Sequence, residues 1–149
     1  MKKLIWSFLI AICASCAEQE VQQVLPKATG STYQMMTSYL EPAADQIWGS
    51  AGLIITEDGE VDLRPTTEEG WLNVINAATV VAEGGNLLLI NGYSANEADW
   101  AAYSKGLTLA ALKARQAAES QDADALFDAG GEIYNVCRAC HNRYIERMD

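Results

Sequence analysis

Three residues near the end of the chain have the types and the spacing that hold a metal-containing cofactor. Cys137 and Cys140 are separated by two residues, and His141 follows at once. His141 is the only histidine among the 149 residues. On a helix these positions are related by i+3 and i+4, so both sulfur atoms and the imidazole project toward one side. The run is the CxxCH sequence to which a c-type haem is attached through two thioether bonds.

Three other interpretations of this run are weaker. A redox-active dithiol belongs at a helix N-terminus in a βαβ context, whereas this pair lies late in a helical pattern. A zinc site takes four ligands, and the run supplies three, so a carboxylate would have to come from elsewhere. A structural disulfide between Cys137 and Cys140 is the third alternative. The spacing favours one covalent haem c per chain.

The first residues have the pattern of a secretory signal, which we assign to residues 1–17. Two lysines precede an apolar run over residues 4–12, and small residues follow. Cleavage after Ala17 fits the small-residue rule; alternatively, Cys16 is the lipidated first residue of a bacterial lipoprotein. The run is shorter than the ~20 apolar residues that span a bilayer. We therefore expect an exported, periplasmic protein, either soluble or anchored to the membrane through a lipid on Cys16.

The charge balance excludes one class of partner and favours another. The chain has 20 acidic and 10 basic residues, a net charge of −10. Removal of residues 1–17 takes away two basic residues and no acidic ones, so the exported chain carries −12. Nucleic-acid binding needs a cluster of Lys and Arg, and the sequence has no such cluster. A redox partner protein with a basic docking face is the expected partner.

The apolar periodicity of the chain predicts four helices and little else. The expected segments are Thr32 to Trp48, Thr66 to Gly84-Gly85, Ser94 to Ser120, and Asp122 or Asp124 to Ile145. The first segment has a core stripe at steps of three and four, formed by Tyr33, Met36, Leu40, Ala44 and Ile47. Four amphipathic helices with short connections predict an all-α protein, an antiparallel four-helix bundle over residues 31–149.

Local signals refine these boundaries. Pro42 predicts a kink or a restart in the first helix. The spacings Thr66 to Glu69 and Ser94 to Glu97 predict capping boxes. Two glycines inside the last helix, Gly130 and Gly131, indicate either a close approach of a neighbour or a local break. Residues 53–63 form either a small hairpin or a plain loop, and residues 18–30 are a flexible tether.

The chain resembles the cytochrome c-prime family over nearly all of its exported length. The resemblance rests on Met36, on the phrase Glu-Pro-Ala-Ala-Asp at 41–45, on Asp-Ala-Gly-Gly at 128–131, and on the run from Cys140 to Tyr144. The haem motif also lies on the last helix, as in that family. This resemblance implies a four-helix bundle with a covalent haem near the C-terminus and with His141 as the proximal iron ligand.

The opposite face of the haem separates two functional classes in that family. A methionine on the first helix gives a six-coordinate iron suited to electron transfer, whereas an apolar side chain gives a five-coordinate iron that binds NO and CO. Met35 and Met36 are adjacent, so their side chains diverge by about 100° around a helix. Met36 shares the apolar stripe, and we expect it to be the distal ligand. Met35 as the ligand, or no protein ligand at all, are the alternatives.

The remaining residues offer no enzymatic constellation, because no second histidine and no activated serine or cysteine pairing is present. Tyr134, Arg138 and Arg143 are candidates to contact the macrocycle or its propionates, although each also fits an ordinary core or surface position. The sequence therefore predicts a periplasmic electron-transfer cytochrome and not an enzyme, with a gas-binding haem protein as the alternative. A homodimer is compatible with either function.

Overall fold

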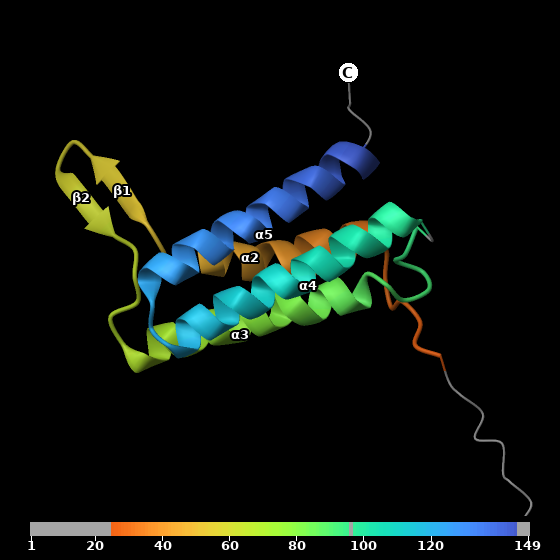
Figure 1. Cartoon of the computed structure of the whole chain (residues 1–149), viewed down its shortest axis with the longest axis horizontal. Coiled ribbons are helices and arrows are strands. Elements are labelled where there is room, and N and C mark those ends of the chain that lie inside the picture. The colour runs from red at the N-terminus through yellow and green to blue at the C-terminus, as the bar shows by residue number, and fades with distance from the viewer. Residues whose placement is uncertain (1–24, 96, 146–149) are drawn as a thin grey trace, which may run out of the picture.

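The computed structural model describes residues 25–95 and 97–145, so the expected signal peptide and most of the expected tether lie outside the described residues. It consists of helices and one small hairpin (Figure 1). The elements in chain order are α1 Thr32–Met35, η1 Met36–Leu40, α2 Glu41–Trp48, β1 Leu53–Thr56, β2 Gly59–Asp62, α3 Glu68–Leu87, α4 Ala98–Glu119 and α5 Ala123–Tyr144.

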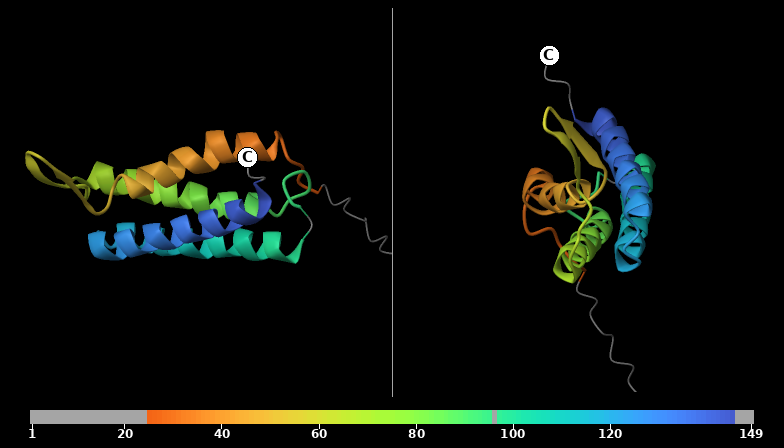
Figure 2. Two further views of the ribbon diagram at one scale, coloured as in Figure 1. Left: turned by 90° about the horizontal axis from the view of Figure 1, so that it is seen from above. Right: turned by 90° about the vertical axis from the view of Figure 1, so that its left-hand side faces the viewer.

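Four helical segments pack side by side and run in alternating directions (Figures 1 and 2). The elements α1, η1 and α2 form the first segment, and α3, α4 and α5 form the other three. Helix α3 packs against α4, α4 packs against α5, and α2 contacts both α3 and α5. The mostly helical fold that the periodicity predicted is confirmed.

The first helical segment changes its winding part-way along. Ser31 and Gln34 form a reciprocal capping box at its start. A π-helical stretch, η1, then precedes α2, which starts at Glu41 with Pro42 in its first turn, so the predicted restart near Pro42 is confirmed. A π turn contains an extra residue and is frequent at functional sites.

This change of winding corrects the predicted core stripe. Leu40, Ala44 and Ile47 are buried as expected, but Tyr33 is 75% exposed. Met35 is buried instead, at 5% exposure. The wider turn places Met35 on the same side as Leu40, five residues later. We expected the core stripe to include Met36 and not Met35, but Met35 lies in the core and Met36, partly buried, packs against it.

Helix α3 begins one residue later than predicted and continues past its double glycine. Thr67, and not Thr66, is the N-cap, and its side chain accepts a hydrogen bond from the backbone N–H of Gly70. Gly84 and Gly85 lie inside the helix, which ends at Leu87. A Cβ at Gly85 would lie 2.7 Å from the carbonyl oxygen of Ser104 in α4. These glycines therefore permit close helix packing and do not end the helix.

The starts of α4 and α5 confirm one capping prediction and correct the other. Asp122 caps α5, where its side chain accepts from the backbone N–H of Ala125 at 3.0 Å. Glu97, and not Ser94, is the N-cap of α4, and its side chain makes no capping hydrogen bond. Both helices end near their predicted positions, at Glu119 and Tyr144.

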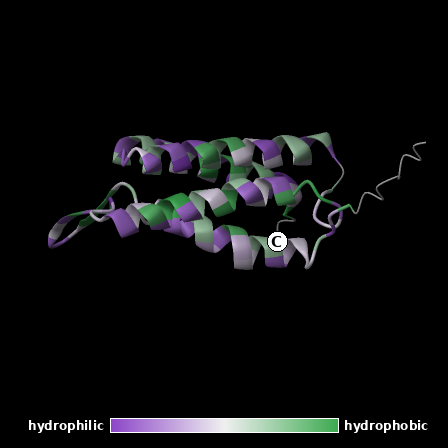
Figure 3. Cartoon of the chain, turned by 90° about the horizontal axis from the view of Figure 1, so that it is seen from below, coloured by the Kyte–Doolittle hydropathy of each residue, from purple (hydrophilic) through white to green (hydrophobic). Residues whose placement is uncertain are grey.

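Residues 53–62 form the hairpin, so the loop alternative is wrong. Strands β1 and β2 pair antiparallel, with Ile54 opposite Val61. Gly59 has a φ of 130°, a conformation that favours glycine. All residues of both strands are exposed, and the hairpin extends away from the helices (Figures 1 and 2). In Figure 3 it carries hydrophobic and hydrophilic residues next to each other.

The last part of the expected tether contacts the connection between α3 and α4. Lys27 forms an isolated parallel bridge with Asn91, and the backbone N–H of Ala28 donates to the carbonyl oxygen of Asn91 at 3.2 Å. Within residues 25–95 and 97–145, no helix is both long enough and apolar enough to cross a membrane.

Candidate functional site

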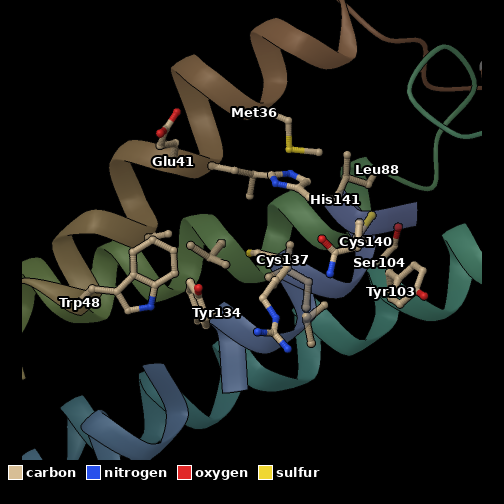
Figure 4. Close-up of a pocket in the computed structure, with 17 residues that line it drawn as sticks. Met36, Glu41, Trp48, Leu88, Tyr103, Ser104, Tyr134, Cys137, Cys140 and His141 are labelled. Carbon is tan, nitrogen blue, oxygen red and sulfur yellow. The ribbon is translucent and has the colours of Figure 1, made fainter. Parts of the chain in front are cut away.

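A cavity of about 350 Å³ lies between the first helical segment and α5 (Figure 4). This size falls within the ~300–1,000 Å³ that is usual for ligand sites. The four residues that the sequence predicts to bind the haem all line this cavity: Cys137, Cys140 and His141 from α5, and Met36 from η1. Residues separated by about 100 positions in the chain are therefore brought to one place.

The CxxCH run lies in the last two turns of α5. Cys137 and Cys140 are partly buried and are free thiols. Burial raises the pKa of both thiols, and the nearby Cys137 thiolate would raise the pKa of Cys140 further. Both sulfurs are therefore neutral at ordinary pH and are not joined in a disulfide.

Met36 and His141 approach each other from different helices. Figure 4 shows the Met36 side chain pointing toward the His141 imidazole across the cavity. Met35 lies in the core, where its methyl carbon would be 3.6 Å from a Cβ at Gly84. The structure thus places Met36, and not Met35, on the cavity wall, as the sequence predicts.

The three further candidates from the sequence separate into two groups. Tyr134 and Arg138 line the cavity. Arg143 does not line it, because its guanidinium forms an ion pair with Asp99 at 3.7 Å. Of the two alternatives given for Arg143, the structure thus favours the surface position, where this side chain links the end of α5 to the start of α4.

Several cavity residues were not identified from the sequence. They come from every helical segment: Leu40, Glu41, Ala44, Trp48, Val81, Leu88, Tyr103, Ser104, Leu107, Val136 and Asn142. The α4 stripe that includes Tyr103 and Leu107 indicates a core face, but no local pattern distinguishes core residues from the lining of a cavity. Their contribution to the site depends on the packing of all four segments.

Helix ends near the site are held by aromatic and polar contacts. The ring of Tyr144, three residues after His141, packs edge-on against Trp100 with ring centroids 5.1 Å apart. Its hydroxyl donates to a carboxylate oxygen of Glu97 at 3.1 Å. On the other side, the indole N–H of Trp48 donates to the carbonyl oxygen of Gly130 at 2.9 Å. These contacts fix α5, and with it the CxxCH run, against α4 and α2.

The lining suits a flat, mostly apolar macrocycle that carries two carboxylates. Most of the lining side chains are aliphatic or aromatic, and two thiols lie on the wall for covalent attachment. An imidazole and a thioether lie on facing elements, and this His/Met pair is the ligand set of electron-transfer cytochromes c. Arg138 supplies a positive charge at the same cavity. The residues present fit a haem.

Among the residues that the structure describes, no group of three or more His, Cys, Asp and Glu side chains is arranged to hold a metal ion. Residues 25–95 and 97–145 therefore supply no fourth ligand for the zinc interpretation of the CxxCH run.

Comparison with known proteins yields no relative. No family model, no curated protein and no solved structure matches the chain.

Proposed function

We propose that this protein is a c-type cytochrome that carries single electrons. One haem c is bound through thioethers at Cys137 and Cys140, with His141 as the proximal iron ligand and Met36 as the distal one. The observation that carries the proposal is the cavity, where the CxxCH run of α5 lies opposite the thioether of Met36. No other described methionine lines it.

The fold suits this function because it holds the two ligand-bearing elements in place before the haem is bound. When bound, the haem supplies reversible one-electron chemistry. The thioether of Met36 would stabilise the ferrous state of that haem and raise its reduction potential, as a His/Met pair does in cytochromes c. The apolar wall, which includes Leu40 and Leu88, limits water access and tunes the potential further.

The proposal includes the finer fold and the location of the protein. We infer an antiparallel four-helix bundle of the cytochrome c-prime type with its haem near the C-terminus. We also infer export to the periplasm after cleavage following Ala17 or lipidation of Cys16. Mass spectrometry of the mature N-terminus distinguishes the two: an acylated Cys16 would contradict simple cleavage after Ala17.

The covalent attachment can be tested on protein expressed in cells that contain a cytochrome c maturation system. We expect one haem per chain, retained on a denaturing gel and quantified as the pyridine haemochrome. The double variant Cys137→Ala/Cys140→Ala should lose all covalent haem, while Met35→Ala, the matched control in the core, should keep it. Wild-type protein that releases its haem on denaturation, or that acquires none, would contradict the proposal.

A further inference from the structure

A second hollow lies on the outer side of the α2/α5 pair. It has a volume of about 420 Å³ and is formed mainly by the end of α2 and the middle of α5. Gly131 contributes to its floor, and nothing lies within 4 Å of the position that a Cβ there would take. The rings of Phe127 and Tyr134 lie four residues before and three residues after it, and both are more than half exposed. The missing side chain thus leaves a groove between two exposed rings.

This groove shares a wall with the haem cavity. Trp48 and Tyr134 line both hollows, and they are the aromatic residues common to the two. Their rings meet edge-on with centroids 6.2 Å apart. Trp48 is also fixed in place by its hydrogen bond to Gly130. Two positioned aromatic rings therefore separate the outer groove from the site proposed for the haem.

The groove continues onto the hairpin. A Cβ at Gly52, the residue before β1, would lie 3.0 Å from the ring of Phe127, so the base of the hairpin adjoins the groove. Leu53, Ile54, Ile55 and Val61 are each about half exposed or more. All residues of the two strands are exposed in the part of the chain that the structure describes. The hairpin and the groove together are called the hairpin–groove face below.

The charges of this face have one sign. Residues 53–62 and 123–135 contain no Lys or Arg, and their acidic residues are Glu57, Asp58, Glu60, Asp62, Asp124, Asp128 and Glu132. Two of these form ion pairs, Asp62 with Arg64 and Glu132 with Lys113. The face thus combines exposed apolar side chains with a surplus of carboxylates, a pattern that suits a partner with the opposite charge at its rim.

We propose that the hairpin–groove face is the docking surface for a redox partner protein whose contact patch is apolar in the centre and lysine-rich at the rim. A protruding apolar side chain of the partner would enter the groove over Gly131, which brings the partner against Trp48 and Tyr134. This inference rests on the proposed function. A second copy of the chain is disfavoured as the occupant because it would bring two acidic faces together.

The proposal can be tested by stopped-flow electron exchange between the reduced haem-bearing protein and a lysine-rich cytochrome c as the probe. At low ionic strength, Glu60→Lys on the hairpin and Asp128→Lys on α5 should each lower the second-order rate on the order of fivefold. Glu83→Lys on α3 changes the net charge equally and should have a much smaller effect. The difference should vanish as salt screens the charges.

A second matched pair of variants tests the apolar part of the hairpin–groove face. Phe127→Ser should slow exchange, whereas Leu109→Ser, at a residue equally exposed on α4, should not. Zero-length carbodiimide cross-links to the probe lysines should map to carboxylates in residues 57–62 and 124–132. Circular dichroism before and after substitution verifies that each variant is folded.

The outcomes separate the two proposals. A chain without a haem absorption band contradicts the proposed function itself. A normal haem band and normal reduction by dithionite, with equal rate losses for Glu60→Lys and Glu83→Lys or with cross-links on α3, would overturn the docking surface alone. A homodimer in sedimentation that Phe127→Ser dissociates would also overturn it, because the face would then be occupied by a second copy.

Discussion

The two sides of the helical assembly are built differently. On the α3/α4 side the helices are in close contact: Gly85 lies against the α4 backbone, and the hydroxyl of Thr108 donates across to the carbonyl oxygen of Ala82 at 3.0 Å. Small residues fill the α4 face, where Ala110, Ala111 and Ala114 are buried. On the α2/α5 side the helices enclose the cavity and flank the outer groove.

This difference in packing indicates that one side of the assembly mainly provides stability, whereas the other carries the residues proposed to bind the haem. The α3/α4 pair buries small side chains at close range and leaves no room for a cofactor between its two helices, so it serves as the support on which one wall of the cavity is built. The first helical segment and α5 keep the space between them open and carry the four proposed haem-binding residues, Met36 on η1 and the other three on α5. An internal cavity lowers the free energy of unfolding, so a protein of this size remains folded only if packing in another region compensates for that loss.

The most direct test of this difference is to add one methyl group on the α3/α4 side and one on the α2/α5 side, by replacing a glycine with alanine in each. Gly85→Ala should reduce the free energy of unfolding by about 3 kcal/mol, because the Cβ would meet the α4 backbone at Ser104 and Thr108. Gly131→Ala meets nothing within 4 Å and should raise it by about 1 kcal/mol, the helix-propensity gain. Urea unfolding followed by circular dichroism measures both. Equal effects at the two sites would contradict the division into a tight and an open side.

A second pair of variants compares the two tryptophans that donate hydrogen bonds to helix carbonyls. The indole of Trp100 is buried and donates to the carbonyl oxygen of Leu88 at 2.7 Å, whereas Trp48 is half-buried and donates to Gly130. Trp100→Phe should cost about 2 kcal/mol, because it leaves a buried acceptor unpaired. Trp48→Phe should cost less than about 1 kcal/mol, because the hydrogen bond that it removes is only partly buried. A larger loss at Trp48 would show that the cavity side carries the stability.

Local signals in the sequence predicted much of this architecture. The start of α5 at Asp122 and the restart at Pro42 depend on their immediate neighbours, so a short stretch of sequence suffices to identify them, whereas the cap at Ser31 was not predicted. The CxxCH run is equally local. The turn chemistry of Asp58-Gly59 indicated a hairpin but did not distinguish it from a loop, because pairing depends on the flanking strands.

Signals that depend on distant neighbours were misjudged. Gly84 and Gly85 look like a helix end, but their contacts are with Leu40 in η1 and with Thr108 in α4. The inward position of Met35 results from a π turn that a uniform period of 3.6 residues does not include. Leu88 and Tyr103 were not identified as cavity residues. Their position on the cavity wall depends on distant neighbours, because the cavity exists only once four segments have packed.

The smallest expected effect concerns the thiols before haem attachment. Burial raises the pKa of Cys137 and Cys140 in the folded chain, so the unfolded chain loses its thiol protons first as the pH rises. The free energy of unfolding of the haem-free chain should therefore be constant below the ordinary thiol pKa and fall above about pH 9. Urea titrations at a series of pH values between about 8 and 10 measure this decline in the free energy of unfolding.

The control for this pH dependence is Cys137→Ala/Cys140→Ala, which should show a weaker decline over the same range. The haem-bearing protein should resemble the control, because thioether sulfurs do not ionise. An identical decline in the haem-free wild type and in the double variant would assign the effect to other groups.

The most direct test of the central claim is the absorption spectrum of the ferric and ferrous haem-bearing protein, with and without carbon monoxide, for the wild type, Met36→Ala and Met35→Ala. We predict a low-spin wild type that does not respond to carbon monoxide. Met36→Ala should become high-spin and bind the gas, while Met35→Ala should remain low-spin. A high-spin wild type that binds carbon monoxide and is unchanged by Met36→Ala would contradict Met36 ligation and make gas binding the leading function.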